Sequence, residues 1–189
     1  TLLLMAHQVV IVGCGFGGLF AARDLAGAPV SVTVLDRTNH HLFQPLLYQV
    51  ATASLSAPAV AAPIRHILAG QDNATVIYGE AARVDTARRK VILDGGDEIA
   101  YDRLIVAVGA ANNYFGNDGW AAHAPSLKTL EDATTLRRRI LVAPRRVPAE
   151  RVPRPVLEVD QTGLGGQPVI GVVDPVARER ARADELVIR

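Results

Sequence analysis

The chain has 189 residues, of which 49% are hydrophobic and 21% charged, and its net charge is +1. These values are ordinary for a globular protein, and the near-zero charge gives no electrostatic reason to expect nucleic-acid binding. Cys14 is the single cysteine, which excludes an internal disulfide, a cysteine-rich zinc site and electron transfer through a paired dithiol. Because no apolar run reaches about 18 residues, no spanning helix is predicted, and a cytoplasmic location is the default.

Residues 8–36 predict a βαβ unit. Residues 8–12 form a short β-branched apolar run, which is typical of a buried parallel strand. A glycine-rich loop follows, and then apolar residues recur at helical spacing up to Gly27, which we expect to end the helix. A second apolar run at 30–35 ends in Asp36 and completes a unit of about 30 residues.

The middle of the chain is less regular. Residues 38–70 contain no clear strand pattern, and we expect a loop with short helices near 46–53 and 64–68. Residues 74–99 alternate β-rich segments with a turn at residues 94–96. That alternation predicts a small antiparallel insertion in the parallel sheet.

Two further elements precede a segment of different composition. Residues 103–108 predict another buried strand, and 129–141 predict a helix with acidic residues early and arginines late, as the helix dipole favours. Residues 143–189 hold six of the eleven prolines and no aromatic residue or lysine. Within them 169–173 suits a strand and 177–186 a polar helix, but no face is large enough for a second core.

A G-x-G-x-x-G pattern, formed by Gly13, Gly15 and Gly18, joins the first predicted strand to the first helix. The first glycine permits a tight turn, the second leaves room for a pyrophosphate, and the third lets helix and strand pack closely. The helix N-terminus then offers free N–H groups to the phosphates. The pattern alone is weak, and an unliganded turn is the alternative, but its strand–loop–helix context favours a dinucleotide site.

The acidic end of the second strand suits a ribose. Asp36 follows Gly18 at close to the spacing of about 20 residues expected for a carboxylate that binds a ribose diol. Its charge disfavours a 2′-phosphate at that position. Arg37 is either a phosphate partner or, as we favour, a solvated loop residue or one that stacks on adenine. Cys14, inside the loop, is expected to be a small neutral filler.

Four segments carry a resemblance to a known family. They are VVIVGCGFGGLFAAR, HHLFQPLLYQVATASLSAPAVAAPIRHIL, YDRLIVAVGAANNYFG and SLKTLEDATTLRRRIL, and the second, residues 40–68, is the most specific. Together they resemble type II NADH:quinone dehydrogenases over about residues 6–142. Where that family ends a strand with Ala-Thr-Gly near the flavin, this chain has Val108 between Ala107 and Gly109.

The resemblance implies an α/β fold, with a Rossmann-like FAD-binding domain over residues 6–142 and an irregular or unrelated tail over 143–189. The domain would have a parallel sheet and a small antiparallel insertion. FAD is the implied cofactor and NADH the co-substrate, with electrons passing from NADH through the flavin to a quinone. Because the flavin supplies the redox centre, we predict no catalytic side chain and no metal ligand.

The family's binding residues are carried over position by position. The pyrophosphate loop corresponds to Gly13, Gly15, Phe16, Gly17 and Gly18, and the adenosine end to Asp36 and Arg37. The loop near the flavin ring corresponds to Gln44, Pro45 and Leu46, and the strand end beside the cofactor to Ala107, Val108 and Gly109. Gln44 alternatively caps the following helix. His40 and His41 fit loop or packing roles better than metal ligation, because no carboxylate accompanies them at ligand spacing.

The chain departs from the family after about residue 142. The family's second glycine-rich unit, which holds NADH, has no counterpart, because residues 163–166 follow no apolar strand and open no helix. We therefore interpret the chain as an N-terminal part, truncated or rearranged near Leu141, without the NADH domain, the quinone pocket or the membrane-anchoring segment. An intact frame at the locus, with no missing downstream coding, would refute this interpretation.

Two alternatives remain open for the function. One is a non-catalytic module that holds FAD or an ADP-like ligand, and the other is a flavoprotein reductase of the ferredoxin or rubredoxin type. The block at residues 40–68 favours the quinone-reducing family over the second of these. The family implies a small-molecule quinone as partner and peripheral contact with the inner face of the membrane, while the oligomeric state is left open.

Overall fold

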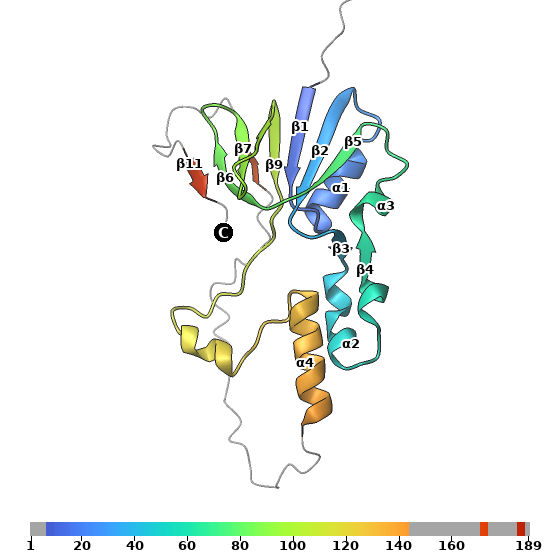
Figure 1. Ribbon diagram of the computed structural model, residues 1–189, viewed down its shortest axis with the longest axis vertical. Coiled ribbons are helices and arrows are strands. Elements are labelled where there is room, and N and C mark those ends of the chain that lie inside the picture. Colours follow the sequence, from blue (N-terminus) through green and yellow to red (C-terminus); the bar gives the residue numbers. More distant parts are fainter. Residues whose placement is uncertain (1–6, 144–170, 174–184, 188–189) are drawn as a thin grey trace, which may run out of the picture. The chain divides into compact units, whose positions relative to one another are not determined.

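The computed structural model describes residues 7–143, 171–173 and 185–187 (Figure 1). These residues fall into two compact units. The first is drawn from residues 1–43, 58–111 and 169–189, and the second from residues 44–57 and 112–168. Each unit has its own secondary structure, and each is described by itself.

A five-stranded sheet with the order β10-β9-β1-β2-β5 forms the centre of the first unit. Four of its strands are parallel, and β10 runs antiparallel to its neighbour β9. The α/β fold with a parallel sheet predicted from the sequence is confirmed. The strands are β1 (His7–Val12), β2 (Val30–Asp36), β5 (Ala74–Tyr78), β9 (Arg103–Val106) and β10 (Gly171–Val173).

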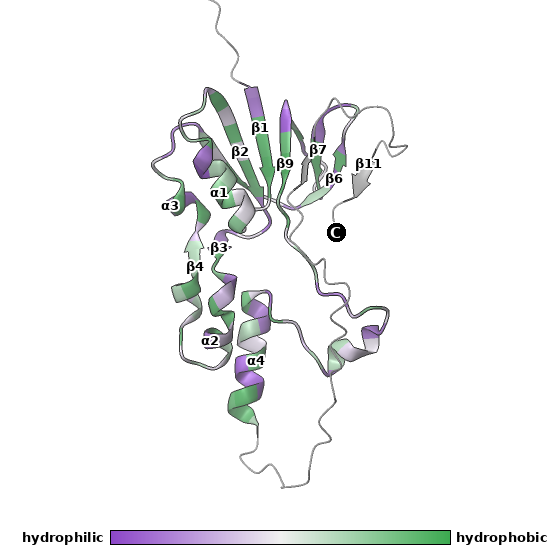
Figure 2. Cartoon of the chain, turned by 180° about the vertical axis from the view of Figure 1, so that it is seen from behind, coloured by the Kyte–Doolittle hydropathy of each residue, from purple (hydrophilic) through white to green (hydrophobic). Residues whose placement is uncertain are grey.

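The parallel strands are buried on both faces, and alternate residues of each strand contribute to different cores. Val9 and Ile11 of β1 pack with residues of helix α1 (Phe16–Asp24). Val10 and Val12 pack instead with the antiparallel sheet described below. In Figure 2 β1 and β9 each begin hydrophilic and become hydrophobic along their length, as expected of strands that enter a core.

The predicted antiparallel insertion is confirmed as a four-stranded sheet with the order β11-β6-β7-β8. It covers one face of the parallel sheet, because Ala81, Val84 and Val91 belong to the same buried cluster as Val10 and Val12. The strands are β6 (Ala81–Asp85), β7 (Lys90–Leu93), β8 (Glu98–Ala100) and β11 (Glu185–Val187).

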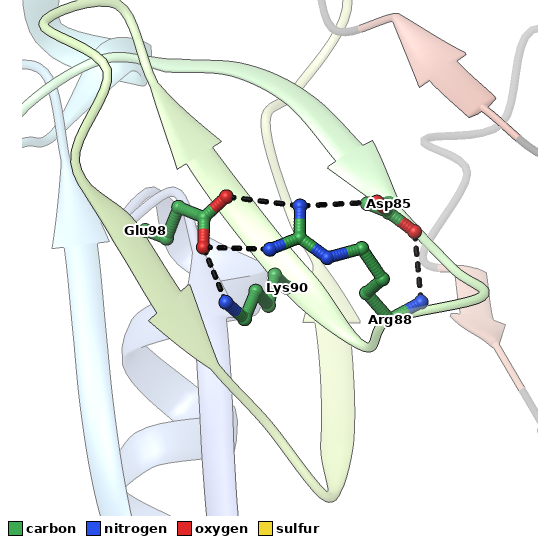
Figure 3. Close-up of polar contacts among 4 residues, drawn as sticks. All are labelled: Asp85, Arg88, Lys90 and Glu98. Carbon is green, nitrogen blue, oxygen red and sulfur yellow. Dashed lines mark hydrogen bonds and ion pairs between the residues drawn. The ribbon is translucent and has the colours of Figure 1, made fainter.

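Charged side chains link the exposed ends of this insertion (Figure 3). Arg88 donates two hydrogen bonds to Glu98, at 3.1 and 3.2 Å, and lies 3.7 Å from Asp85. Lys90 also donates to Glu98. The hydrogen bond from Lys90, and then those from Arg88, lower the pKa of Glu98. Exposed pairs of this kind contribute little to stability, so the network mainly orders the β6–β7 turn against β8.

Three short elements follow β2 and return to the sheet. β3 (His40–Leu42) pairs antiparallel with β4 (Ala61–Pro63), and helix α3 (Ile64–Ile67) then leads towards β5. The single-turn helix η2 (Ala57–Val60) precedes β4. Ile64 is fully buried and joins the core beneath α1, which fixes the start of α3 on the sheet.

The second unit is helical. Its elements are η1 (Gln44–Leu46), α2 (Leu47–Ala51), η3 (Asp118–Ala122) and α4 (Leu130–Val142). Helices α2 and α4 pack on each other and bury Leu47, Val50 and Ala133. Helix α4 begins with a capping box, in which the Thr129 side chain accepts from the Asp132 N–H and the Asp132 carboxylate accepts from the Thr129 N–H, both at 3.0 Å.

Several sequence-based predictions are corrected by the structure. Residues 38–70 do contain strands, β3 and β4, whose three-residue length leaves no periodic pattern. Residues 74–78 form β5 at the edge of the parallel sheet, not part of the antiparallel insertion. Helix α1 ends at Asp24 with Leu25 as its cap, and Gly27 lies in the following turn, because successive short turns at Ala26 and Ala28 lead directly into β2.

The C-terminal predictions have mixed outcomes. Within 169–173, residues 171–173 are a strand as expected. The helix expected at 177–186 is wrong at residues 185 and 186, which belong to β11, because pairing with the edge of β6 supplies hydrogen bonds that local propensity does not reveal. Residues 177–184 lie outside the described residues. The domain boundary at 142 and 143 stays a prediction.

Asn73 holds the connection between α1 and β2. Its side-chain amide lies 2.9, 3.3 and 3.1 Å from the carbonyl oxygens of Leu25, Ala28 and Val30. Gln71 completes the arrangement by donating to the Asn73 side-chain oxygen at 3.0 Å. The Leu25 and Ala28 carbonyls also accept from backbone N–H groups of the turn, so the Asn73 side chain adds further hydrogen bonds that tie this turn to the segment before β5.

We expect Asn73→Ala to destabilise the first unit by about 1–3 kcal/mol, because it removes the part-buried hydrogen bonds that join the Asn73 side chain to three carbonyl groups of the turn before β2. Urea denaturation measures the loss. Asn117→Ala is the matched control, since that amide reaches its two carbonyls only at 3.4 Å in an exposed loop, and its cost should stay within about 0.5 kcal/mol. Equal costs for the two variants would contradict this role of Asn73.

Candidate functional site

The glycine-rich loop lies where the strand order of the parallel sheet reverses. The chain moves from β1 to β2 on one side, whereas β9 returns on the other side of β1 (Figure 1). The carboxyl ends of β1 and β9 therefore border a topological switch point, where open α/β sheets bind ligands. The loop after β1 and the segment 107–109 after β9 meet at this point.

Gly13 makes the turn out of β1. Its φ of +94° is one that residues with a side chain rarely adopt. A Cβ atom added there would lie 2.4 Å from the Ala107 carbonyl oxygen and 3.1 Å from the Val108 Cα. Only glycine therefore allows the loop to pass so close to the end of β9.

Gly18 sets the distance between α1 and the turn. A Cβ atom on Gly18 would lie 1.8 Å from the Gly13 carbonyl oxygen and 3.3 Å from the Ile11 side chain. The surroundings of Gly15 are open, because an added Cβ would meet no described protein atom within 4 Å. The protein thus has close contacts at the first and third glycines and open space at the second.

The N-terminus of α1 is suited to an anion. Gly15 is its N-cap and makes no side-chain cap, and the first turn contains no acidic residue. The first N–H groups of a helix have no partner within the helix and carry partial positive charge. Phe16, Gly17 and Gly18 contribute these N–H groups, so the open space beside Gly15 faces favourable donors for a phosphate.

Asp36 connects the end of β2 to the loop. One oxygen of its half-buried carboxylate accepts the Cys14 N–H at 2.5 Å. The other accepts the backbone N–H and the hydroxyl of Thr38, at 2.6 and 2.7 Å. The carboxylate is therefore held beside the N-terminus of α1, and the oxygen that accepts only the Cys14 N–H keeps lone-pair capacity for a hydroxyl donor.

Cys14 is buried beneath the loop. Burial raises the pKa of its thiol from 9.0 to about 12, and the Asp36 carboxylate adds to this, whereas Arg23 lowers it. The thiol is therefore neutral at physiological pH. A neutral sulfur places no negative charge beside a bound phosphate, which is compatible with the packing role expected from the sequence.

An aromatic group lies beside the same loop. The His41 Nδ1 atom is 2.9 Å from the Cys14 carbonyl oxygen. The His41 ring meets the Phe16 ring edge-on, with centroids 5.3 Å apart and an interplanar angle of 85°. Phe43 makes a similar contact with Phe16 at 5.5 Å. His41 therefore has a packing role, as predicted, and in addition a polar contact with the loop.

An open hollow of about 570 Å³ follows the ends of β2 and β5. Arg37 lines it and pairs with Glu80 at 3.4 Å. Arg65 also lines it and donates to the Val76 carbonyl at 3.2 Å. Its full lining is Arg37, Thr38, Asn39, His40, Arg65 and Tyr78. The hollow suits the adenosine end of a ligand anchored at Asp36, although the role of Arg37 stays a prediction.

The structure brings most of the predicted site residues together. The loop 13–18, Asp36 and residues 107–109 surround one switch point in the first unit. Residues 44–46 form η1, which belongs to the second unit, so their place beside a flavin stays a prediction. Sequence reasoning missed the contact of Thr38 with Asp36, which the two-residue spacing of an Asx turn would have indicated. It also missed the bond of His41 to Cys14, for which no local signal exists.

Metal-binding clusters and membrane-spanning helices are both absent from the residues that the structure describes. No cluster of three or more histidine, cysteine, aspartate or glutamate side chains is placed to hold a metal ion there. None of the helices in that part is long and apolar enough to span a bilayer.

Comparison with known proteins identifies the family of the chain. Residues 7–147 match the family described as pyridine nucleotide-disulphide oxidoreductase. Over 140 residues the chain is 49% identical to the type II NADH:quinone oxidoreductase Ndh of Mycobacterium tuberculosis, covering 72% of this chain and 30% of that protein. The chain thus spans about a third of the length of the curated relatives it matches. The resemblance inferred from the four sequence segments is confirmed.

Solved structures give the same result. NDH2 from Plasmodium falciparum, in complex with RYL-552, superposes with a TM-score of 0.64 at 26% identity, over 72% of this chain and 29% of that one. A covalent putidaredoxin reductase–putidaredoxin complex gives a TM-score of 0.55 at 28% identity, over 71% and 34%. The architecture is therefore shared by redox proteins with different electron acceptors.

We expect Gly18→Ala to destabilise the first unit by more than about 3 kcal/mol or to prevent folding, because its Cβ would overlap a backbone carbonyl that cannot move independently. Gly27→Ala is the matched control, since a Cβ there meets no described atom within 4 Å. Circular dichroism with urea denaturation compares the two variants. A Gly18→Ala protein as stable as Gly27→Ala would show that α1 can shift away from the turn.

The raised pKa of Cys14 predicts a stability loss at alkaline pH. Below pH 9.0 the thiol is protonated in both folded and unfolded chains, so its contribution to folding is fully present. Between pH 9.0 and about 12 the unfolded thiol ionises while the folded one does not, and stability falls by at most about 1.4 kcal/mol per pH unit. Urea denaturation between pH 8 and about 11 should show a smaller decline for Cys14→Ala than for the unaltered chain. Parallel declines would contradict the shift.

Proposed function

This chain belongs to the pyridine nucleotide-disulphide oxidoreductase family, and from that premise we propose that its first unit binds the ADP half of FAD. Family membership implies a flavin and NAD(H) as the redox pair. An ADP group is common to FAD and NAD, so the loop by itself does not separate them. The choice of FAD rests on the resemblance of residues 40–68 and 107–109 to the segments that lie near the flavin in type II NADH:quinone dehydrogenases. One observation carries the proposal: the hydrogen bond from Cys14 N–H to Asp36 holds a carboxylate beside the open N-terminus of α1.

In this proposal the chain's own residues bind and orient the cofactor. The N–H groups at residues 15–18 donate to the diphosphate, and Asp36 accepts from the ribose hydroxyls. The same carboxylate disfavours a 2′-phosphate by charge repulsion. Residues 107–109 allow close approach beside the loop, Arg37 lies at the adenosine end, and residues 44–46 approach the flavin ring. The flavin, when bound, supplies the capacity to accept a hydride and pass on electrons.

The proposed reaction of the whole protein is electron transfer from NADH to a quinone. Support comes from the 49% identity with a type II NADH:quinone oxidoreductase over 140 residues. That likeness is much closer than the 28% identity with putidaredoxin reductase, so a quinone is favoured over a ferredoxin-type protein as electron acceptor. Such a reaction takes place against the membrane, and we propose peripheral contact at its cytoplasmic face.

Titration with FAD and with ADP tests the binding proposal. We expect both ligands to bind this chain, with little FAD retained through purification, because these residues enclose the cofactor from one side only. Gly15→Ala should weaken binding by about tenfold or more and leave the free energy of unfolding within about 0.5 kcal/mol, since its Cβ enters the space for the diphosphate and meets no described protein atom. Isothermal titration calorimetry and urea denaturation measure the two effects.

Gly27→Ala again serves as the control and should bind both ligands like the unaltered chain. Failure of FAD and ADP to bind would refute the proposed site, as would equal affinity in Gly15→Ala. The visible spectrum then separates the remaining functions after FAD is added. Bleaching by NADH supports the oxidoreductase, whereas a bound flavin that NADH does not bleach supports a binding module without turnover.

A further inference from the structure

The backbone of Cys14 is held by side chains from two different elements. Asp36, at the end of β2, accepts its N–H at 2.5 Å. His41, in β3, contacts its carbonyl oxygen at 2.9 Å. We propose that His41 is a positioning residue that orients the peptide group between Cys14 and Gly15, and with it one of the N–H donors to a diphosphate. This inference rests on the proposed function of the loop.

The hydrogen bond defines which ring nitrogen of His41 carries a proton. A carbonyl oxygen can only accept, so the Nδ1 atom must be the donor. Every form of the ring that makes this bond therefore carries a proton on Nδ1.

Peptide planarity transmits this contact to the ligand side of the loop. The Cys14 carbonyl and the Gly15 N–H belong to one planar trans peptide group and point in opposite directions. Because His41 fixes the direction of the carbonyl, it also fixes the direction of the Gly15 N–H. Rotation of this peptide would turn a carbonyl oxygen towards the phosphate site, where its partial negative charge repels an anion.

His41 is itself held in place. Its backbone pairs with Ala62 of β4, and the next segment is fixed by the Phe43 N–H, which donates to the Val60 carbonyl at 2.7 Å. Its ring lies edge-on against Phe16, the first residue of α1. One side chain thus contacts both the residue before Gly15 and the residue after it, which suits a role in setting the conformation between them.

Two substitutions separate the hydrogen bond from the ring contact. His41→Phe keeps an aromatic ring against Phe16 but removes the donor. His41→Asn removes the ring but keeps an N–H close to the position of the Nδ1 atom. We expect the dissociation constant for ADP, measured by calorimetry on the whole chain, to rise about tenfold in His41→Phe and to stay within about threefold in His41→Asn.

A measurement without ligand tests the positioning directly. In ¹⁵N relaxation measurements on the chain without ligand, the order parameter of the Gly15 N–H should fall from about 0.85 to below about 0.6 in His41→Phe and stay unchanged in His41→Asn, because only the former frees the peptide. The order parameter of the Asn73 N–H controls for general loosening and should be the same in all three proteins.

The outcomes distinguish this inference from the proposed function. If the unaltered chain does not bind ADP, the proposed function fails, and the order parameter of the Gly15 N–H alone decides whether His41 holds the loop. If the unaltered chain binds ADP and His41→Phe binds equally well, the positioning role is overturned while the site stands. Equal losses of ADP affinity in both variants would show that the effect does not follow the N–H donor, and would also overturn the positioning role.

Discussion

The close approach of α1 to the end of β1 is the constraint on which the rest of the first unit depends. At Gly18 there is no room for even one added carbon beside the Gly13 carbonyl. Because the helix starts at that distance, its unpaired N–H groups lie directly after the strand, and α1 can cover the sheet with Leu19 and Ala22 buried. Packing and ligand binding therefore require the same glycine, and neither can change without the other.

A second consequence of this geometry is that the short loop is held by groups from distant parts of the sequence. The Cys14 N–H donates to Asp36, and the Cys14 carbonyl accepts from His41. The Cys14 side chain is buried. Open space remains at Gly15, where an added Cβ atom would meet no described atom within 4 Å. A loop fixed in this way loses little freedom when a ligand binds, which is the condition for preorganised recognition.

The two faces of the parallel sheet are used differently. One is covered by α1 and the start of α3, and the other by the antiparallel insertion between β5 and β9. The Arg88–Glu98 network lies on this insertion, and its exposed ion pairs organise a turn without contributing to the site.

Local patterns in the sequence determined the βαβ unit, the glycine-rich turn, the acid after the second strand, the insertion and the start of α4, because each depends on neighbours a few residues apart. Only the tertiary structure decided the rest. The assignment of β5 to the parallel sheet, the strand at 185–187 in place of a helix, and the bond of His41 to Cys14 all depend on partners distant in sequence. Such pairings are chosen by which edges and carbonyls remain unsatisfied after the core forms, and no local propensity records that choice.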